Sequence, residues 1–287
     1  MRRISAEAIE LFERYLREEE KSAATVEKYL RDVQAFVRWL ADKNLEVEKS
    51  TVVAYKAQLC EGYAISSVNS ALSSLNAFFS FLGWHELKVR TLKCQRRIFA
   101  SEERELTKAE YERLLLAARN RKNERLYLLM QTVCATGIRI SELRFITVAA
   151  VETGRAEIAC KGKRRNVFLP SKLCKVLKRY AQSRKIKSGP VFVTKRGNPL
   201  DRSNIWSEMK KLCADAGVSE KKVFPHNLRH LFARTYYTVR KDIVRLADLL
   251  GHSSVNTTRI YTMESGEIHR KQIASRTAPM LTGYSRQ

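Results

Sequence analysis

The sequence predicts a mainly α-helical protein with a small antiparallel β-sheet, divided into two domains. A chain of 287 residues is long for a single core, which favours two domains. Apolar residues at helical spacing fill residues 1–85 and return after residue 106. Residues 86–105 carry clustered basic side chains without a sustained apolar stripe, as an interdomain linker would. Short β-type runs interrupt the helices of residues 106–287.

The first domain, residues 1–85, is predicted to be a bundle of helices. Ser22 can cap the start of one strong helix, and Gly83 ends another. No catalytic cluster is visible in this part of the sequence. The apolar stripes predict four helical stretches, at residues 9–15, 22–40, 52–59 and 65–82.

The second domain, residues 106–287, is predicted to mix helices with a few strands. Thr107 opens a T-K-A-E capping box, which marks the start of a helix. A longer apolar helix leads into Gly137. The sequence contains no Walker loop and no G-x-G-x-x-G motif, so we expect no nucleotide cofactor. Three β-type runs are predicted, at residues 145–151, 156–160 and 166–169.

The positive charge of the chain is concentrated in the second domain. The whole chain carries +24, of which residues 1–85 contribute −1, residues 86–105 contribute +2 and residues 106–287 contribute +23. Repulsion of this size weakens a compact fold, so it signals a polyanionic partner. Nucleic acid is the first candidate. An anionic membrane surface is the rival, but no run of spanning length and no lipidation motif supports it.

The cysteines and the first residues predict a cytoplasmic protein. Six cysteines are scattered, with no C-x-x-C pair and no histidine at ligand spacing. This pattern favours free thiols in a reducing compartment over disulfides or a zinc site. The chain starts with basic and then acidic residues and lacks the apolar core of a signal peptide. We therefore expect no metal and no other cofactor.

Five segments of the basic domain carry residues suited to cleavage of a phosphodiester. Each segment is weak evidence alone, because Arg139 could simply pair with Glu142 and a single histidine or tyrosine is usually structural. Their joint order and spacing carry the argument. The segments are G-I-R-I-S-E-L with Arg139, C-K-G-K-R-R with Lys161, H-N-L-R-H with His226 and Arg229, L-L-G-H with His252, and I-Y with Tyr261.

This order, Arg…Lys…H-x-x-R…His…Tyr, resembles that of the tyrosine recombinases, the phage-integrase and Xer-like family. Residues 22–40 and 65–82 also resemble the family's N-terminal helices, so the resemblance covers nearly the whole chain. It departs at Ile138, where leucine is commoner, and this apolar exchange puts nothing in doubt. The resemblance implies an N-terminal helical core-binding domain and a C-terminal α+β tyrosine-recombinase catalytic domain, in a simple Xer-like organisation.

The resemblance also implies the chemistry, which is site-specific DNA recombination through a 3′-phosphotyrosyl intermediate. Tyr261 is the implied nucleophile, and no ATP is required because the covalent link conserves the bond energy. Arg139 and Arg229 would bind the non-bridging phosphate oxygens through their rigid forks. Such chemistry serves integration, excision, inversion or resolution of DNA.

Four further residues receive roles from the same resemblance. His226 would act as an acid or base, and His252 would hydrogen-bond a non-bridging oxygen. Lys161, at the tip of a predicted hairpin, would protonate the leaving 5′-oxygen, with Lys163 as the nearby alternative. Glu142 would orient neighbouring groups.

The implied partners are double-stranded DNA at specific sites and other protomers of the same protein. Four protomers would act on two paired sites, and residues 262–287 would pass into a neighbour. Accessory DNA-bending or directionality proteins are further candidates, and no membrane is expected. Two alternatives stay open: a type IB topoisomerase-like enzyme that relaxes DNA, and a catalytically inactive DNA-binding regulator. The N-terminal helices argue against the first, and the five intact motifs argue against the second.

Overall fold

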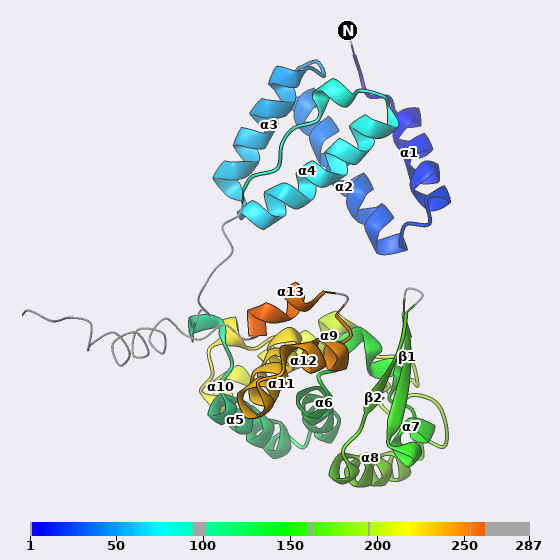
Figure 1. The fold of residues 1–287 in the computed structure, drawn as a ribbon, viewed down its shortest axis with the longest axis vertical. Helices are drawn as coiled ribbons and strands as arrows, with labels where there is room; N and C mark the ends of the chain where they lie inside the picture. The colour runs from blue at the N-terminus through cyan, green and yellow to red at the C-terminus, as the bar shows by residue number, and fades with distance from the viewer. Residues whose placement is uncertain (1, 94–101, 161–162, 195, 253, 262–287) are drawn as a thin grey trace, which may run out of the picture. The chain divides into compact units, whose positions relative to one another are not determined.

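The chain forms two compact units, Met1–Arg96 and Arg97–Gln287, which are described separately (Figure 1). The computed structural model describes residues 2–93, 102–160, 163–194, 196–252 and 254–261. Over these residues the architecture is mainly helical with one two-stranded antiparallel sheet, so the predicted fold class is confirmed. None of the helices in these ranges is long and apolar enough to span a membrane.

The first unit is a bundle of four helices around an aromatic core. Ser5 and Ser22 begin the first two helices, each accepting a hydrogen bond at its hydroxyl from a backbone N–H of the first turn. Phe12, Phe36 and Phe78 are fully buried between the helices. All four predicted helical stretches are confirmed. The helices are α1 (Ala6–Glu18), α2 (Ala23–Asp42), α3 (Lys49–Gly62) and α4 (Ile65–Phe81).

The first unit extends beyond its fourth helix into the segment that we expected to be linker. A short 3₁₀ turn, η1 (His85–Leu87), follows α4, and Val89 is buried in the same core. The Asn76 side chain exchanges hydrogen bonds with the backbone of Val89, and the Asn69 side chain does the same with Leu92. These amides satisfy backbone groups that would otherwise need water, so the chain runs along α4 up to residue 92.

The second unit contains nine described α-helices and the sheet. Thr107 and Glu110 cap each other's backbone N–H groups at the start of α5, which confirms the predicted capping box. The α-helices are α5 (Lys108–Asn120), α6 (Glu124–Thr136), α7 (Val148–Thr153), α8 (Ser171–Ser183), α9 (Arg202–Lys210), α10 (Cys213–Ala216), α11 (Pro225–Arg240), α12 (Ile243–Leu250) and α13 (Val255–Thr258). Short 3₁₀ turns are η2 (Glu102–Arg104), η3 (Ile140–Phe145), η4 (Glu220–Lys222) and η5 (Arg259–Tyr261).

The sheet is a hairpin of β1 (Arg155–Cys160) and β2 (Lys163–Phe168), paired in register from Arg155 opposite Phe168. Two of the three predicted β-type runs are thereby confirmed. The third, at residues 145–151, is wrong, because these residues end η3 and begin α7. The Thr147 hydroxyl accepts a hydrogen bond from Ala150 and caps α7, and this local cap prevails over the β-propensity of the segment.

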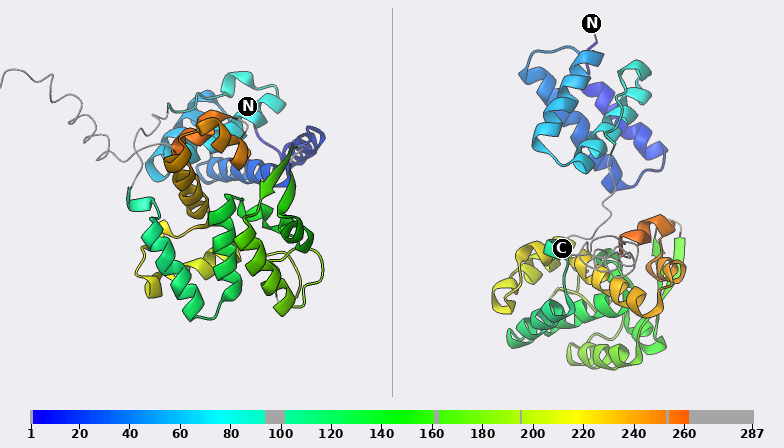
Figure 2. Two further views of the ribbon diagram at one scale, coloured as in Figure 1. Left: turned by 60° about the horizontal axis from the view of Figure 1, so that its bottom comes forward. Right: turned by 60° about the vertical axis from the view of Figure 1, so that its left-hand side comes forward.

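Helix α11 packs against α6 and α12 within the second unit (Figure 2). The start of the unit is also tied to α11. Asn227, which is buried, donates to the Arg104 carbonyl, and Arg234 pairs with Glu105 and donates to the Leu106 carbonyl at 2.5 Å. These contacts fix the helix that carries His226, Arg229 and His230.

Candidate active site

Five of the six predicted site residues lie within the described residues, and the fold gathers them at the C-terminal end of α12. They come from four segments that are far apart in the sequence. Lys161 lies outside the described residues, and so does the predicted tail, 262–287. The five are Arg139 just before η3, His226 and Arg229 on α11, His252 just after α12, and Tyr261 at the end of η5.

Glycine at two helix ends allows this gathering. Gly137 ends α6 with φ of +65°, and a Cβ on it would lie 2.5 Å from the Phe232 ring. Gly251 ends α12 with φ of +62°, again in the left-handed region that only glycine adopts readily. Both helices therefore stop abruptly, and the chain turns to bring Arg139 and His252 to the same place.

Three consecutive carbonyls at the end of α12 each accept a hydrogen bond from a different arginine. The last carbonyls of a helix have no partner within the helix and carry partial negative charge, so they attract cations. The pairs are Arg165 Nη1 with the Leu249 carbonyl at 2.6 Å, Arg229 Nη2 with the Leu250 carbonyl at 2.7 Å, and Arg139 Nη2 with the Gly251 carbonyl at 3.4 Å.

Glu142 binds two of these arginines, Arg139 and Arg165. Its buried carboxylate accepts from Arg139 Nη1 at 2.9 Å and from the Arg139 backbone N–H at 3.0 Å. Its second oxygen also accepts from Arg165 Nη2 at 2.5 Å. Burial raises the pKa of Glu142, but the hydrogen bond from the Arg139 backbone and the charge of Arg165 outweigh it, so its pKa lies below the ordinary value. Glu142 is thus an anion clamped between two cations.

Arg229 is a buried cation, with 1% of its surface exposed. Its Nη1 donates to the Gly137 carbonyl at 2.5 Å, and its Nε is buried with no hydrogen-bond partner among the described residues. Burial lowers the pKa of Arg229 to about 10, with help from the charge of Arg139, while the nearby Tyr261 acts in the opposite direction. Arg229 therefore stays charged at neutral pH, next to the predicted nucleophile.

The hydrogen bonds of His252 define its tautomer. Its Nε2 lies 3.0 Å from Arg229 Nη2, and its Nδ1 lies 2.9 Å from the Thr258 hydroxyl. Since a guanidinium only donates, Nε2 accepts, and in the neutral ring Nδ1 carries the proton. Burial lowers the pKa of His252 to about 4, assisted by Arg229 and Arg139, so the ring is neutral at pH 7.

Tyr261 and two histidines of α11 form a chain of ring contacts. The rings of His226 and His230 meet with centroids 4.6 Å apart, and those of His230 and Tyr261 do so at the same distance. His226 is exposed, yet crowding by neighbouring atoms and the charge of Arg229 lower its pKa. Burial lowers the pKa of His230 to about 3. Since the pKa of His226 is also lowered from its ordinary value, both rings are neutral at pH 7.

Sequence reasoning missed two members of this cluster, Arg165 and His230. His230 stands in the H-N-L-R-H motif, from which the resemblance implies roles only for His226 and Arg229. Arg165 had a detectable signal, because side chains alternate along a strand and Val167, two positions on, is buried, while Arg164 and Asn166 are exposed. This alternation places Arg165 on the inward side of β2.

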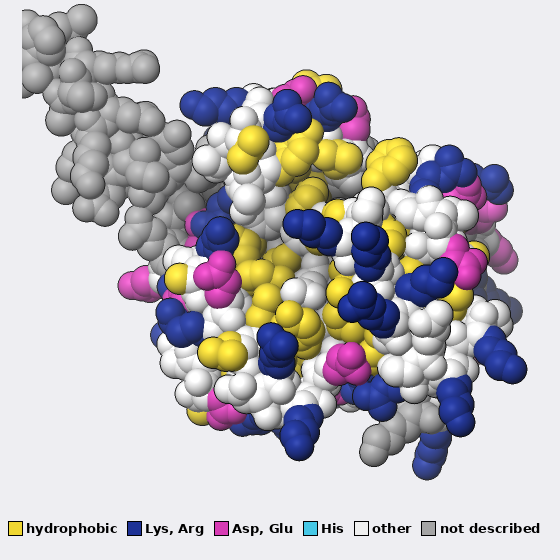
Figure 3. Space-filling model, turned by 90° about the horizontal axis from the view of Figure 1, so that it is seen from below, with side chains coloured by type: hydrophobic (Ala, Val, Ile, Leu, Met, Phe, Trp, Pro, Cys, Tyr) yellow, Lys and Arg dark blue, Asp and Glu magenta, His cyan; other side chains and the backbone are white. Residues whose placement is uncertain are grey.

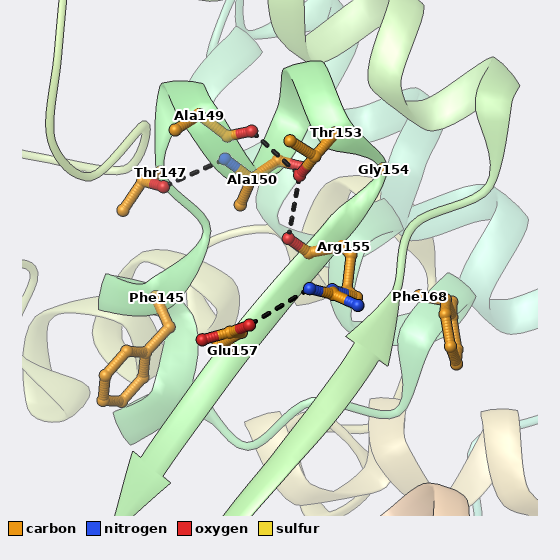
Figure 4. Close-up of a pocket in the computed structure, with 9 residues that line it drawn as sticks. All are labelled: Phe145, Thr147, Ala149, Ala150, Thr153, Gly154, Arg155, Glu157 and Phe168. Carbon is orange, nitrogen blue, oxygen red and sulfur yellow. Dashed lines mark hydrogen bonds and ion pairs between the residues drawn. The ribbon is translucent and has the colours of Figure 1, made fainter.

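A hollow of about 600 Å³ beside α7 and β1 contains none of the predicted site residues. Figure 4 shows Phe145 and Phe168 on opposite sides of it, with Arg155 and Glu157 on β1 between them. The two charged side chains pair with each other at 3.2 Å. The described site residues that the sequence predicts thus lie at the end of α12 and not in this hollow. Across the described residues, no three His, Cys, Asp or Glu side chains are grouped to hold a metal.

Comparison with known proteins agrees with the fold. Residues 104–267 match the phage integrase family, and residues 9–86 match the phage integrase N-terminal SAM-like domain. The chain is 33% identical over 274 residues to tyrosine recombinase XerA of Thermococcus kodakarensis, covering 92% of this chain and 93% of that protein. It is 30% identical over 283 residues to tyrosine recombinase XerC of Roseiflexus castenholzii, covering 89% and 88%.

Solved structures share the fold. A crystal structure of XerA recombinase matches with a TM-score of 0.52 and 25% identity, over 97% of this chain and 99% of that one. XerH bound to its difH substrate matches with a TM-score of 0.70 and 20% identity, over 96% and 86%. A lambda integrase dimer bound to a core site matches with a TM-score of 0.71 and 18% identity, over 90% and 94%.

A SAM-like helical unit followed by an integrase unit, with arginines, histidines and a tyrosine gathered at one helix end, defines a class of DNA strand-breaking and rejoining enzymes. The chain belongs to the phage integrase family. Within it, the chain is a tyrosine recombinase, an enzyme of site-specific recombination.

Proposed function

We propose that Tyr261 is the nucleophile of strand cleavage. Its hydroxyl oxygen would bond to the scissile phosphorus, the bond to the 5′-oxygen would break, and a 3′-phosphotyrosyl link and a free 5′-hydroxyl would result. The observation that carries this proposal is that Tyr261 lies against His230 and His252 and beside Arg229 of the same chain. Tyr261 is 3% exposed, so its hydroxyl has to be uncovered before the scissile phosphate can reach it.

Arg139 and Arg229 would neutralise the charge that gathers on the non-bridging oxygens in the transition state. Hydrogen bonds to Glu142 and to the carbonyls of α12 hold both guanidiniums in place before DNA binds, so little reorganisation is needed at the moment of reaction. The Arg139 side chain is 41% exposed and is open to an incoming phosphate. The Nε of Arg229 still has a hydrogen bond to give.

His226 would transfer protons, and His252 would bind a neighbouring group through its ring nitrogens. His226 is exposed and neutral, so it is suited to accept the proton of the attacking hydroxyl or to return it in the reverse step. His252 donates one ring N–H to Thr258 and accepts from Arg229, so both nitrogens are engaged. To donate a hydrogen bond to the phosphate, the Nε2 atom of His252 would have to lose its contact with Arg229 and take up a proton. If Nε2 keeps its contact with Arg229, His252 acts by orienting Arg229.

Lys161 would supply the proton to the leaving 5′-oxygen, with Lys163 as the alternative. Lys163 begins β2 opposite Cys160, and Lys161 directly follows Cys160 in the sequence. No cofactor enters this scheme, because the protein's own cations and the phosphotyrosyl bond account for each step.

The substrate that we propose is double-stranded DNA at specific sites, bound by a set of protomers. Figure 3 shows lysine and arginine side chains spread over one face, consistent with the charge of +23 in residues 106–287. Lambda integrase forms a dimer on a core site and a tetramer on a Holliday junction. We propose a tetramer on two synapsed sites here, with accessory DNA-bending or directionality proteins as further partners. A cytoplasmic location fits the four described free cysteines.

The test replaces the nucleophile. Tyr261→Phe should bind a cognate site normally and form no covalent DNA adduct, whereas the unchanged protein should form one that survives denaturation. An adduct with Tyr261→Phe would contradict the proposal and turn attention to Tyr236 and Tyr237. Relaxation of supercoiled DNA by monomers without recombinant products would instead indicate a topoisomerase. Tight binding without any adduct from the unchanged protein would indicate an inactive regulator.

A further inference from the structure

Arg165 of β2 forms a polar bridge between two parts of the site. Its side chain is only 16% exposed. One Nη donates to the Leu249 carbonyl at 2.6 Å, and the other donates to the Glu142 carboxylate at 2.5 Å. A guanidinium is planar with its donors in a fixed fork, so these two bonds set the distance between their acceptors.

The end of α12 is shaped to receive this side chain. A Cβ on Gly251 would lie 2.4 Å from Arg165 Cδ and 2.7 Å from Nε, closer than any real side chain allows. The missing side chain of Gly251 thus lets Arg165 lie directly over the last turn. Because Arg165 leaves from the middle of a paired strand, opposite Ile158, its backbone is held by the hairpin.

The two acceptors of Arg165 are the supports of two proposed catalytic residues. Glu142 binds both the backbone and the side chain of Arg139. Leu249 stands three residues before His252, on the turn that presents its ring. A displacement of the first support would move Arg139, and a displacement of the second would move the His252 ring that contacts Arg229.

We propose that Arg165 is a positioning residue, which locks Glu142 to the end of α12 and so keeps Arg139 and His252 at a fixed separation. This inference rests on the proposed function of those two residues. Misplacing a catalytic group by an ångström costs on the order of 100-fold in rate, so loss of the bridge should slow cleavage by about 10- to 100-fold. DNA affinity should change far less, because Arg165 is largely covered.

The experiment measures single-turnover cleavage of a nicked cognate site at saturating protein, together with DNA binding and thermal melting. It compares Arg165→Ala and Arg165→Lys with Arg164→Ala, which removes the same charge from an exposed neighbour on the same strand. We expect Arg165→Ala to bind like Arg164→Ala but to cleave at least 10-fold more slowly. Arg165→Lys should recover part of the rate, because an ammonium keeps the charge but cannot reproduce the fork.

A second, independent measurement uses the close approach of Gly251. Gly251→Ala should slow cleavage in the unchanged background, partly because the new methyl displaces Arg165. In the Arg165→Ala background the same change should cost less, because the clash is gone and only the backbone strain remains. Additive effects of the two substitutions would contradict a shared contact.

Two results of the cleavage assay would overturn the proposal. One is equal cleavage by Arg165→Ala and Arg164→Ala at saturation, because a loss that disappears there reflects binding alone. The other applies if Arg165→Ala fails to fold: cleavage at the full rate by a folded Arg165→Lys would show that the fork is not needed. Failure of the proposed function is separate, because it would appear as an adduct formed by Tyr261→Phe.

Discussion

The ring of His230 meets the ring of Tyr261 edge to face, with centroids 4.6 Å apart and planes at 81°. His230 also touches His226, so it is wedged between an exposed histidine and the proposed nucleophile. Edge-to-face contacts of aromatic rings contribute about 0.5–1.5 kcal/mol beyond the area they bury, and they have a defined direction. The contact therefore orients the tyrosine ring from the side of α11.

His230→Leu should slow formation of the covalent adduct by about 10-fold, because a branched aliphatic side chain leaves the tyrosine ring without its edge contact. The matched variant is His230→Phe, which keeps a ring and removes both nitrogens. Recovery with phenylalanine would assign the effect to packing, and failure to recover would assign it to a ring nitrogen. An unchanged adduct rate in His230→Leu would show that the contact is dispensable.

Glu142→Gln should destabilise the protein, because it removes the negative charge between Arg139 and Arg165. Removal of one partner from a buried ion pair costs about 3 kcal/mol, and the Glu142 side chain is 5% exposed. Urea denaturation monitored by circular dichroism measures the loss. Glu157→Gln is the control, since Glu157 pairs with Arg155 on the surface and such pairs contribute less than about 1 kcal/mol. Equal midpoints for the two variants would refute the structural role of Glu142.

Lys161→Ala should cleave ordinary DNA slowly and should be rescued by a substrate in which sulfur replaces the leaving 5′-oxygen, because a thiolate leaves without a proton. Lys163→Ala provides the comparison on the same substrates. Rescue of Lys163→Ala alone would transfer the role of general acid to that residue. Rescue of neither variant would mean that the proton comes from another group.

Stability should fall when the pH drops below 6.5. In the folded protein the pKa of His252 lies near 4 and that of His230 near 3, both below the ordinary value of 6.5. Between those values the unfolded chain binds more protons than the folded one, so the free energy of unfolding decreases as the pH falls and is regained above 6.5. Urea midpoints from pH 7.5 to 5 measure this slope.

In His252→Gln and His230→Leu the slope should be shallower than in the unchanged protein, while His85→Gln, at an exposed position of the first unit, is the control. If all four proteins show the same slope, the half-buried His230 and His252 do not set it.

Deletion of residues 265–287 tests the coupling between protomers. We expect the truncated protein to bind and cleave single sites but to yield no recombinants from two sites, because the tail would dock on a neighbour in the synapse. Recombination at the rate of the full chain would show that the tail is dispensable. Loss of cleavage on single sites would mean that the tail serves its own protomer.

The sequence by itself determined the local structure wherever one strong pattern was present. The stripes at residues 22–40 and 65–82 predicted helices that the structure confirms, because burial of one helix face repeats every 3.6 residues whatever the partner. The order of five motifs indicated the family without reference to geometry. The run at residues 145–151 misled, because β-propensity describes a half-buried surface and Thr147 instead caps a helix.

Only the tertiary structure decided how the site is held together. Arg165 reaches a carbonyl 84 residues further along the chain, and Arg139 reaches one 112 residues further. No periodic pattern reports such pairings, because they depend on where α12 ends and on which side of the hairpin faces it. Sequence patterns record how much of each residue is buried, whereas the choice of hydrogen-bond partner follows from the packing of α6, α11 and α12. For that reason the motifs indicated roles for Arg139 and Arg229, whereas Arg165 and His230, which stand in the same motifs, received theirs only from the fold.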